Sequence, residues 1–88
     1  MRREPDYFED GESLVLIYIA KKLKESLALE ALLTQREVDY LVEVDMYSGG
    51  IIFRSERAGA FFYVREAERD EVSDLMRENR YTPMRDME

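Results

Sequence analysis

The stretch that decides the fold is Leu14-Val-Leu-Ile-Tyr-Ile-Ala20, followed by a segment with helical periodicity and then by Val38-Asp-Tyr-Leu-Val-Glu-Val-Asp-Met46. The first part is continuously apolar, whereas apolar residues recur about every 3.6 positions in the middle part and at every second position in the last. Two parallel strands joined by a crossover helix produce this succession. The sequence therefore predicts a β-α-β unit.

The predicted elements of this unit differ in how they are covered. Residues 14–20 are apolar on both faces, which is typical of a central strand covered on both sides. The helix presents an apolar face, which we expect to pack on the sheet. This face consists of Leu23, Leu27, Ala28, Ala31 and Leu32, and Leu29 and Leu33 widen it. The second strand has one core side, formed by Val38, Tyr40, Val42, Val44 and Met46, and one largely wet side.

The second half of the chain is expected to add strands and one more helix. Gly49-Gly50 predicts a turn, residues 51–54 a short strand, residues 57–59 a second turn and residues 60–64 a third main strand. Residues 66–79 favour a helix with a buried stripe of Val72, Leu75 and Met76. Asn79 can adopt the left-handed conformation and is expected to end this helix, and Pro83 prevents its resumption.

The order β-α-β-β-(β)-α predicts an α+β fold, namely a two-layer ferredoxin-like sandwich of the split β-α-β type. A short C-terminal edge strand beginning at Tyr81 would complete it. A chain of 88 residues is enough for one small domain, which we place at residues 13–83. Residues 1–12 are expected to form a mobile acidic leader and residues 84–88 a tail. Alternatively, Tyr7 and Phe8 fold back over an exposed sheet face.

Composition narrows the class of function. The net charge of −7 argues against nucleic acid as a partner, since such binding relies on cations that neutralise phosphates. The chain has no Cys and no His, which removes thiol chemistry, the commonest metal ligand and the usual general base. We therefore expect no enzyme and no cofactor. The apolar run at residues 14–20 is too short to cross a membrane and lacks the flanks of a secretory signal, so we expect a cytoplasmic protein with no membrane partner.

Four short segments stand out together: Tyr18-Ile-Ala20, Leu27-Ala-Leu-Glu-Ala-Leu-Leu33, Val38-Asp-Tyr40 and Phe62-Tyr-Val64, the last followed by an acidic helix over residues 66–78. Across residues 14–83 this pattern resembles a small bacterial family of signal-transducing proteins related in fold to the PII (GlnB-like) nitrogen regulators. Such domains often have Gly where Glu37 stands and Pro where Arg65 stands. The resemblance implies a regulatory or binding role, and it carries over no ligand residue.

Two charged clusters are candidate sites. Lys21, Lys22 and Lys24 lie where the first helix begins, and a helix N-terminus favours anions. They predict a small-anion site, with a solvated cluster balanced by Glu25 as the alternative. The second cluster is a row of carboxylates on one strand face, at Asp39, Glu43 and Asp45. Such a row could bind a hard cation, but it equally serves to block unwanted pairing with other sheets. We expect no metal there.

One further expectation concerns self-association. A single helix layer covers one face of the sheet, so the other face would present an apolar patch. A symmetric homodimer would bury this patch, whose predicted members are Leu14, Leu16, Tyr18, Leu41 and Phe62. The leading hypothesis is thus a non-enzymatic regulatory or protein-interaction module that uses its sheet surface or residues 47–59. A small-anion or nucleotide-type ligand sensor is the alternative, and a carboxylate- or metal-dependent enzyme is a third.

Overall fold

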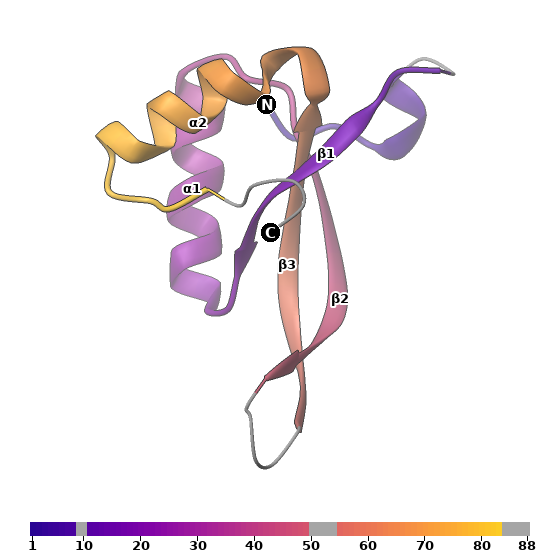
Figure 1. Ribbon diagram of the computed structural model, residues 1–88, viewed down its shortest axis with the longest axis vertical. Coiled ribbons are helices and arrows are strands. Elements are labelled where there is room, and N and C mark those ends of the chain that lie inside the picture. Colours follow the sequence, from indigo (N-terminus) through magenta and orange to yellow (C-terminus); the bar gives the residue numbers. More distant parts are fainter. Residues whose placement is uncertain (9–10, 50–54, 84–88) are drawn as a thin grey trace.

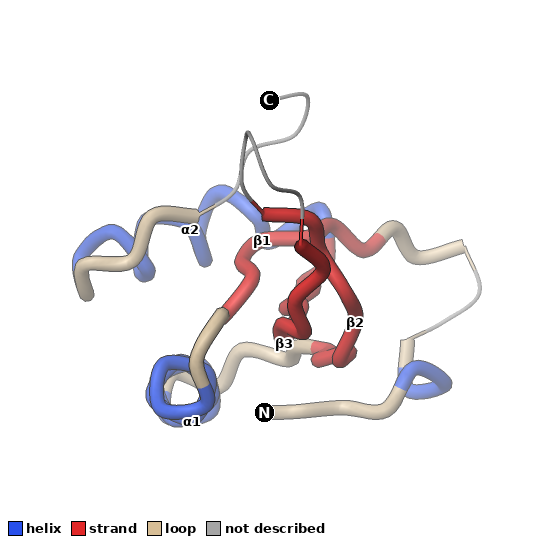
Figure 2. Tube along the Cα trace, turned by 90° about the horizontal axis from the view of Figure 1, so that it is seen from below, coloured by secondary structure: helices blue, strands red, loops and turns tan. Residues whose placement is uncertain are grey.

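The computed structural model describes residues 1–8, 11–49 and 55–83, and it is an α+β fold with two helices and one antiparallel sheet. The strands are β1 (Leu14–Ala20), β2 (Leu41–Gly49) and β3 (Ser55–Arg65), and the helices are α1 (Leu23–Gln35) and α2 (Arg69–Glu78). Two 3-10 turns, η1 (Pro5–Tyr7) and η2 (Glu66–Glu68), precede β1 and α2. Both helices lie on one side of the sheet, and the hairpin of β2 and β3 extends beyond them (Figure 1, Figure 2).

The sheet has the order β1-β3-β2, and β3 is antiparallel to both of its neighbours. β1 and β2 therefore run parallel to each other, but they do not pair directly. The chain returns from β2 through a hairpin, and β3 enters the space between the two parallel strands. Because β1 pairs only with β3 among the described strands, the prediction that it is central is wrong.

A β-bulge in β1 changes which of its side chains face the helices. Leu16 lies opposite Tyr63, and pairing resumes with Tyr18 opposite Phe62, so Ile17 is an extra residue. Residues opposite one another in a sheet share a face, and a bulge shifts the alternation by one position. Ile17 and Phe62 are fully buried in the core, and Tyr18 packs against it. Leu16 and Tyr63 point to the other face, which we call the open face.

The hairpin is longer than the sequence indicates. β2 pairs with β3 from Leu41 opposite Tyr63 to Gly49 opposite Ser55, whereas β1 accompanies β3 only as far as Ala60. Residues 57–59, where we expect a turn, are part of β3 and pair with β2, so that prediction is wrong. The strand expected at residues 51–54 falls in a segment that the structure leaves undescribed.

The buried face of α1 is rotated from the predicted one. Leu29 and Leu33 are fully buried, whereas Leu23 is 75% exposed and Leu27 is 56% exposed. Leu32 packs against the core only partly buried. The predicted face is wrong because leucines occur around the whole helix, and tertiary packing selects one of several apolar stripes.

Both helices end in a residue with a left-handed backbone. Glu37 follows α1 with φ of 60°, and the N–H of Val38 donates to the carbonyl oxygen of Leu33 at 2.9 Å. After α2 the residue with positive φ is Arg80, at 69°, whereas Asn79 has φ of −109°. The prediction that Asn79 adopts this conformation is therefore wrong by one residue.

The second helix agrees closely with its prediction. η2 and α2 together occupy residues 66–78, Val72 and Met76 are buried, and Leu75 packs against the core. Residues 81–83 form no strand, although the ring of Tyr81 packs edge-to-face on Tyr18 with centroids 5.5 Å apart. The described residues therefore contain no edge strand at Tyr81.

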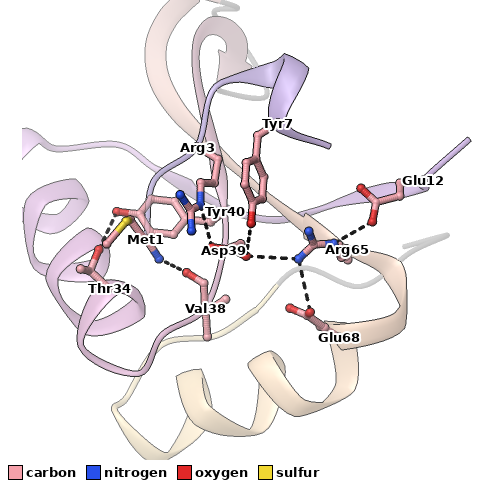
Figure 3. A network of polar contacts seen from close by, with 10 residues as sticks. All are labelled: Met1, Arg3, Tyr7, Glu12, Thr34, Val38, Asp39, Tyr40, Arg65 and Glu68. Carbon is pink, nitrogen blue, oxygen red and sulfur yellow. Dashed lines mark hydrogen bonds and ion pairs between the residues drawn. The ribbon is translucent and has the colours of Figure 1, made fainter. Parts of the chain in front are cut away.

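The N-terminal segment is docked beside the start of β2. The N–H of Arg3 donates to the carbonyl oxygen of Tyr40 at 2.8 Å, and the N–H of Tyr40 donates to that of Met1 at 3.2 Å. Arg2 forms a parallel bridge with Tyr40, and the amino group of Met1 donates to the carbonyl oxygen of Val38 (Figure 3). The sequence favours a mobile leader over residues 1–12, but the structure places residues 1–8 against the sheet.

Aromatic side chains of this segment cover one end of the open face. Phe8 is buried, and its ring centroid lies 5.1 Å from the guanidinium carbon of Arg65. The guanidinium carbon of Arg3 lies 4.2 Å from the centroid of Tyr7. The register places Leu41 on the open face, and it is nevertheless buried. It does not belong to the core cluster that lies beneath the helices. This arrangement corresponds to the alternative in which Tyr7 and Phe8 fold back over the sheet.

Candidate functional site

The most suitable binding surface is a groove between α1 and the inner side of the β2–β3 hairpin, with a volume of about 470 Å³. One wall comes from the first turns of α1, the other from the hairpin face that points to the helices, and the floor from the end of β1. We call this surface the α1–hairpin groove, and it is lined by Arg2, Ala20, Lys21, Lys22, Leu23, Ser26, Leu27, Glu30, Val42, Val44, Ala58, Gly59 and Ala60.

Large apolar side chains of both walls are exposed to water. Leu23 and Leu27 extend from α1, and Val44 of β2 is 78% exposed. Met46, two residues further along the same strand face, is 51% exposed. Single exposed apolar residues are common on protein surfaces, but a contiguous group that lines a groove is typical of an interaction site. Sequence reasoning assigned Leu23, Leu27, Val44 and Met46 to the core and so missed this site.

Small residues also line the groove. Ala20, Ala58 and Ala60 have only a methyl group, and Gly59 has no side chain. Ala20 and Ala60 lie where the three strands meet, since Ala60 pairs with both Ala20 and Val44, and Ala58 and Gly59 follow on the ribbon beyond β1. Their small size leaves room for the side chains of a bound partner.

The predicted anion-binding lysines lie at one end of this groove. Lys21 and Lys22 line it, whereas Lys24 is exposed outside it. Arg2 also lines the groove and pairs with Glu30, with nitrogen and oxygen 3.7 Å apart. The structure therefore brings two of the three lysines to an apolar surface, which the sequence did not indicate.

Glu25 fixes the backbone at the start of α1. Its carboxylate accepts from the backbone N–H of Lys21 at 3.1 Å and from the hydroxyl of Tyr18 at 3.0 Å. Burial, together with this hydrogen bond to a carboxylate, raises the pKa of the Tyr18 hydroxyl to about 12. Tyr18 therefore lies on the helix side of the sheet. The prediction that it belongs to an interface on the open face is wrong.

The other predicted interface residues are divided between the two faces. Phe62 is fully buried beneath the helices, and the bulge in β1 brings Tyr18 opposite it on the same face. Leu41 is buried at the end of the sheet that the N-terminal segment covers. Only Leu14 and Leu16 of the predicted set remain partly exposed on the open face, where partly buried neighbours accompany them at Ile19, Phe61 and Tyr63.

The predicted acidic row is also divided. Asp39 precedes β2 and accepts a hydrogen bond from the Nε of Arg3 at 2.8 Å, with Tyr7 and Arg65 each 3.4 Å away (Figure 3). Glu43 and Asp45 are exposed on the open face. No group of three or more potential metal ligands gathers within the described part of the chain.

Arg65 links Asp39 to two further carboxylates. Its Nε donates to Glu12 at 2.9 Å, and its Nη1 lies 3.5 Å from Glu68. Burial alone would raise the pKa of the Asp39 carboxyl, but hydrogen bonding and the charge of Arg3, with help from Arg65, hold this pKa below its ordinary value. The hydrogen bond to Glu12 raises the pKa of Arg65. This network ties the N-terminal segment to the sheet.

A second hollow of about 500 Å³ lies between the end of α1 and α2. Five of its lining residues are acidic, and Arg36 is the cation among them. Its charge suits a cationic group better than an anion. The full lining is Arg36, Glu37, Val38, Glu68, Glu71, Val72, Asp74, Leu75 and Glu78.

Comparisons with protein-family models, curated proteins and solved structures gave no match to this chain. Across residues 1–8, 11–49 and 55–83, no helix has the length and apolar character needed to span a membrane. The functional argument therefore rests on the geometry of the molecule.

Proposed function

We propose that this protein is a non-enzymatic regulatory module that binds another protein in the α1–hairpin groove. The observation that carries the proposal is the contiguous exposure of Leu23, Leu27 and Val44 on the two walls of the groove. Burying apolar surface is worth about 25 cal/mol per Å² removed from water, so these side chains favour association. They do little for the isolated fold because they remain in contact with water.

The hairpin offers a second reason for a partner at this place. Beyond Ala60, β2 and β3 continue as a two-stranded ribbon without β1. Isolated two-stranded ribbons are only marginally stable in water. A partner that packs on the inner side of the ribbon would hold Val44 and Met46 out of water.

We also propose that the domain has the ferredoxin-like arrangement. Support comes from the two parallel strands with β3 between them and from the two helices on one side. The resemblance to PII-like signal-transducing proteins supports a regulatory role for a domain of this kind, by analogy of fold alone.

A small-anion sensor is the second candidate, and Lys21 and Lys22 at the groove support it. A thermal-shift screen with nucleotides, organic acids and inorganic phosphate tests this candidate. An anion at 100 times its Kd would stabilise the fold by about 2.7 kcal/mol. The Lys21→Glu/Lys22→Glu variant should keep the fold and lose the shift. A shift that persists in this variant would remove both lysines from the site.

A homodimer through the open face is the candidate for self-association. The partly buried row that includes Leu14, Leu16, Phe61 and Tyr63 supports it. The end of the same surface near Arg65 is already covered by the N-terminal segment, with Phe8 and Leu41 buried there. The N-terminal segment and a second subunit would therefore compete for one face of the sheet.

The main proposal is tested by selecting peptides from an unbiased displayed library against the intact protein. Selected peptides should bind the wild type and lose most of their affinity for Leu27→Glu. Ala28→Glu is the matched control, since Ala28 is exposed on α1 but does not line the groove. Peptides that bind Leu27→Glu as tightly as the wild type would refute the groove as the docking site.

A further inference from the structure

We infer that the partner presents an acidic amphipathic helix to the α1–hairpin groove, an inference that rests on the docking function proposed above. Three properties of the groove support this inference: its shape, the spacing of its exposed apolar side chains and its charge. A helix, unlike an extended segment, satisfies its own backbone hydrogen bonds while lying on a surface made of side chains. The groove is such a surface, because its walls are a helix and the face of a sheet.

The layer of helices has room for one more member. Neighbouring strands are about 4.8 Å apart and packed helices about 8–10 Å, so two helices spread evenly over the sheet could cover its three strands, but here they are not spread evenly. Both α1 and α2 contact β1, and the inner face of β2 leaves Val44 and Met46 exposed. A partner helix beside α1 would extend the helix layer over β2.

The spacing of exposed side chains suits a helix with apolar residues four positions apart. Leu23 and Leu27 are separated by about 6 Å along the axis of α1, given a rise of about 1.5 Å per residue. Val44 and Met46 are separated by about 7 Å along β2, given about 3.4 Å per residue. Successive apolar side chains at i and i+4 of a bound helix have the same period of about 6 Å and fit between both rows.

The charge of the groove favours an acidic occupant. Lys21 and Lys22 lie where α1 begins, the positive end of its dipole, and the Arg2–Glu30 pair adds no net charge. The chain as a whole carries a net charge of −7, so an acidic helix is repelled by most of the surface and attracted to this end of the groove. Opposite charges thereby select both the partner and its position.

The described residues of a second copy do not supply a suitable helix. α2 is its acidic amphipathic helix, but the apolar stripe of Val72 and Met76 is buried in its own core. Presenting this stripe to a groove would require unfolding the domain that carries it. Among the described residues no helix is therefore free to enter the groove of a second copy, and we infer that the helix belongs to a different protein.

A pair of designed peptides tests this inference with the intact chain. Each has about 14 residues with leucines at i, i+4, i+7 and i+11, and the remaining positions carry Glu and Ala in one and Lys and Ala in the other. Fluorescence anisotropy gives the affinities, and circular dichroism gives the helicity of the bound peptide. We expect the Glu peptide to bind as a helix, at least about tenfold more tightly than the Lys peptide, and with an affinity that falls as salt rises.

The Lys21→Glu/Lys22→Glu variant should remove this preference, while Lys24→Glu, outside the groove, should largely keep it. Equal binding of the two peptides, or an unchanged preference in the double variant, would overturn the acidic helix. If neither peptide binds while library-selected peptides still require Leu27, the inference fails and the docking function stands. Concentration-dependent dimerisation that Val44→Lys abolishes would make the second copy the occupant and would also overturn the inference.

Discussion

Truncating two leucines on opposite sides of α1 separates residues that hold the fold from residues that serve the groove. Leu29 is fully buried in the core, and Leu29→Ala should lower the free energy of unfolding by about 2–5 kcal/mol, through lost burial and the cavity left behind. In a domain of this size each kcal/mol corresponds to about 4–8 °C in Tm. A loss of about 3 kcal/mol would therefore lower Tm by roughly 12–24 °C.

Leu27→Ala is the matched control because the same atoms are removed from a side chain that is 56% exposed. Its cost should stay below about 1 kcal/mol, since much of that side chain contacts water in the folded state already. Urea denaturation of both variants, followed by circular dichroism at constant pH, measures the two free energies. Equal losses, or a larger loss for Leu27→Ala, would refute the orientation of α1 and with it the groove.

Three other predictions concern the N-terminal segment and the end of α1. Asp39→Asn should cost about 1–2 kcal/mol, as it weakens partly exposed hydrogen bonds to charged Arg3 and Arg65. The pKa of Asp39 is lower in the folded state, so this contribution is complete above the ordinary value of 3.8 and disappears as pH falls through the lowered one. A denaturation series from pH 7 to well below pH 3.8 should show the gap between variant and wild type closing, and a constant gap would contradict the network. Glu37→Gly should raise the free energy of unfolding by about 0.5–1 kcal/mol, because Gly adopts the left-handed conformation without steric cost, and a loss measured by urea denaturation would contradict this. A chain that begins at Gly11 should associate more strongly than the full chain in sedimentation velocity, since the open face loses its cover; unchanged association would show that the N-terminal segment does not compete with a second subunit.

Parts of the fold were predictable because local pattern and tertiary packing agree. The stripe of Val72 and Met76 places α2 correctly, and the alternation over residues 38–46 predicts a strand that overlaps the observed one, although β2 runs from Leu41 to Gly49. The bulge at Ile17 was not predictable, because a strand that is apolar at every position looks the same in either register. This one residue moves Tyr18 from the open face to the core.

The groove was hidden for a related physical reason. α1 carries leucines on more sides than one small sheet can cover, and the sequence alone does not tell which of them are left over. Helical periodicity groups Leu23 and Leu27 with the core, although packing selects Leu29 and Leu33. The excess of leucines was the available signal, since an apolar stripe beyond the one that packs remains for a partner. The docking of the N-terminal segment depends on contacts between Arg3 and Asp39, which local patterns do not reveal.

Nuclear magnetic resonance mapping of a library-selected peptide on the isotope-labelled full chain tests docking in the α1–hairpin groove most directly. The largest amide shifts should occur at Leu23, Leu27 and Val44, on both walls of the groove, and they should vanish in Leu27→Glu but persist in Ala28→Glu. Shifts that centre instead on Leu16 and Tyr63 would place the partner on the open face and contradict the proposed function.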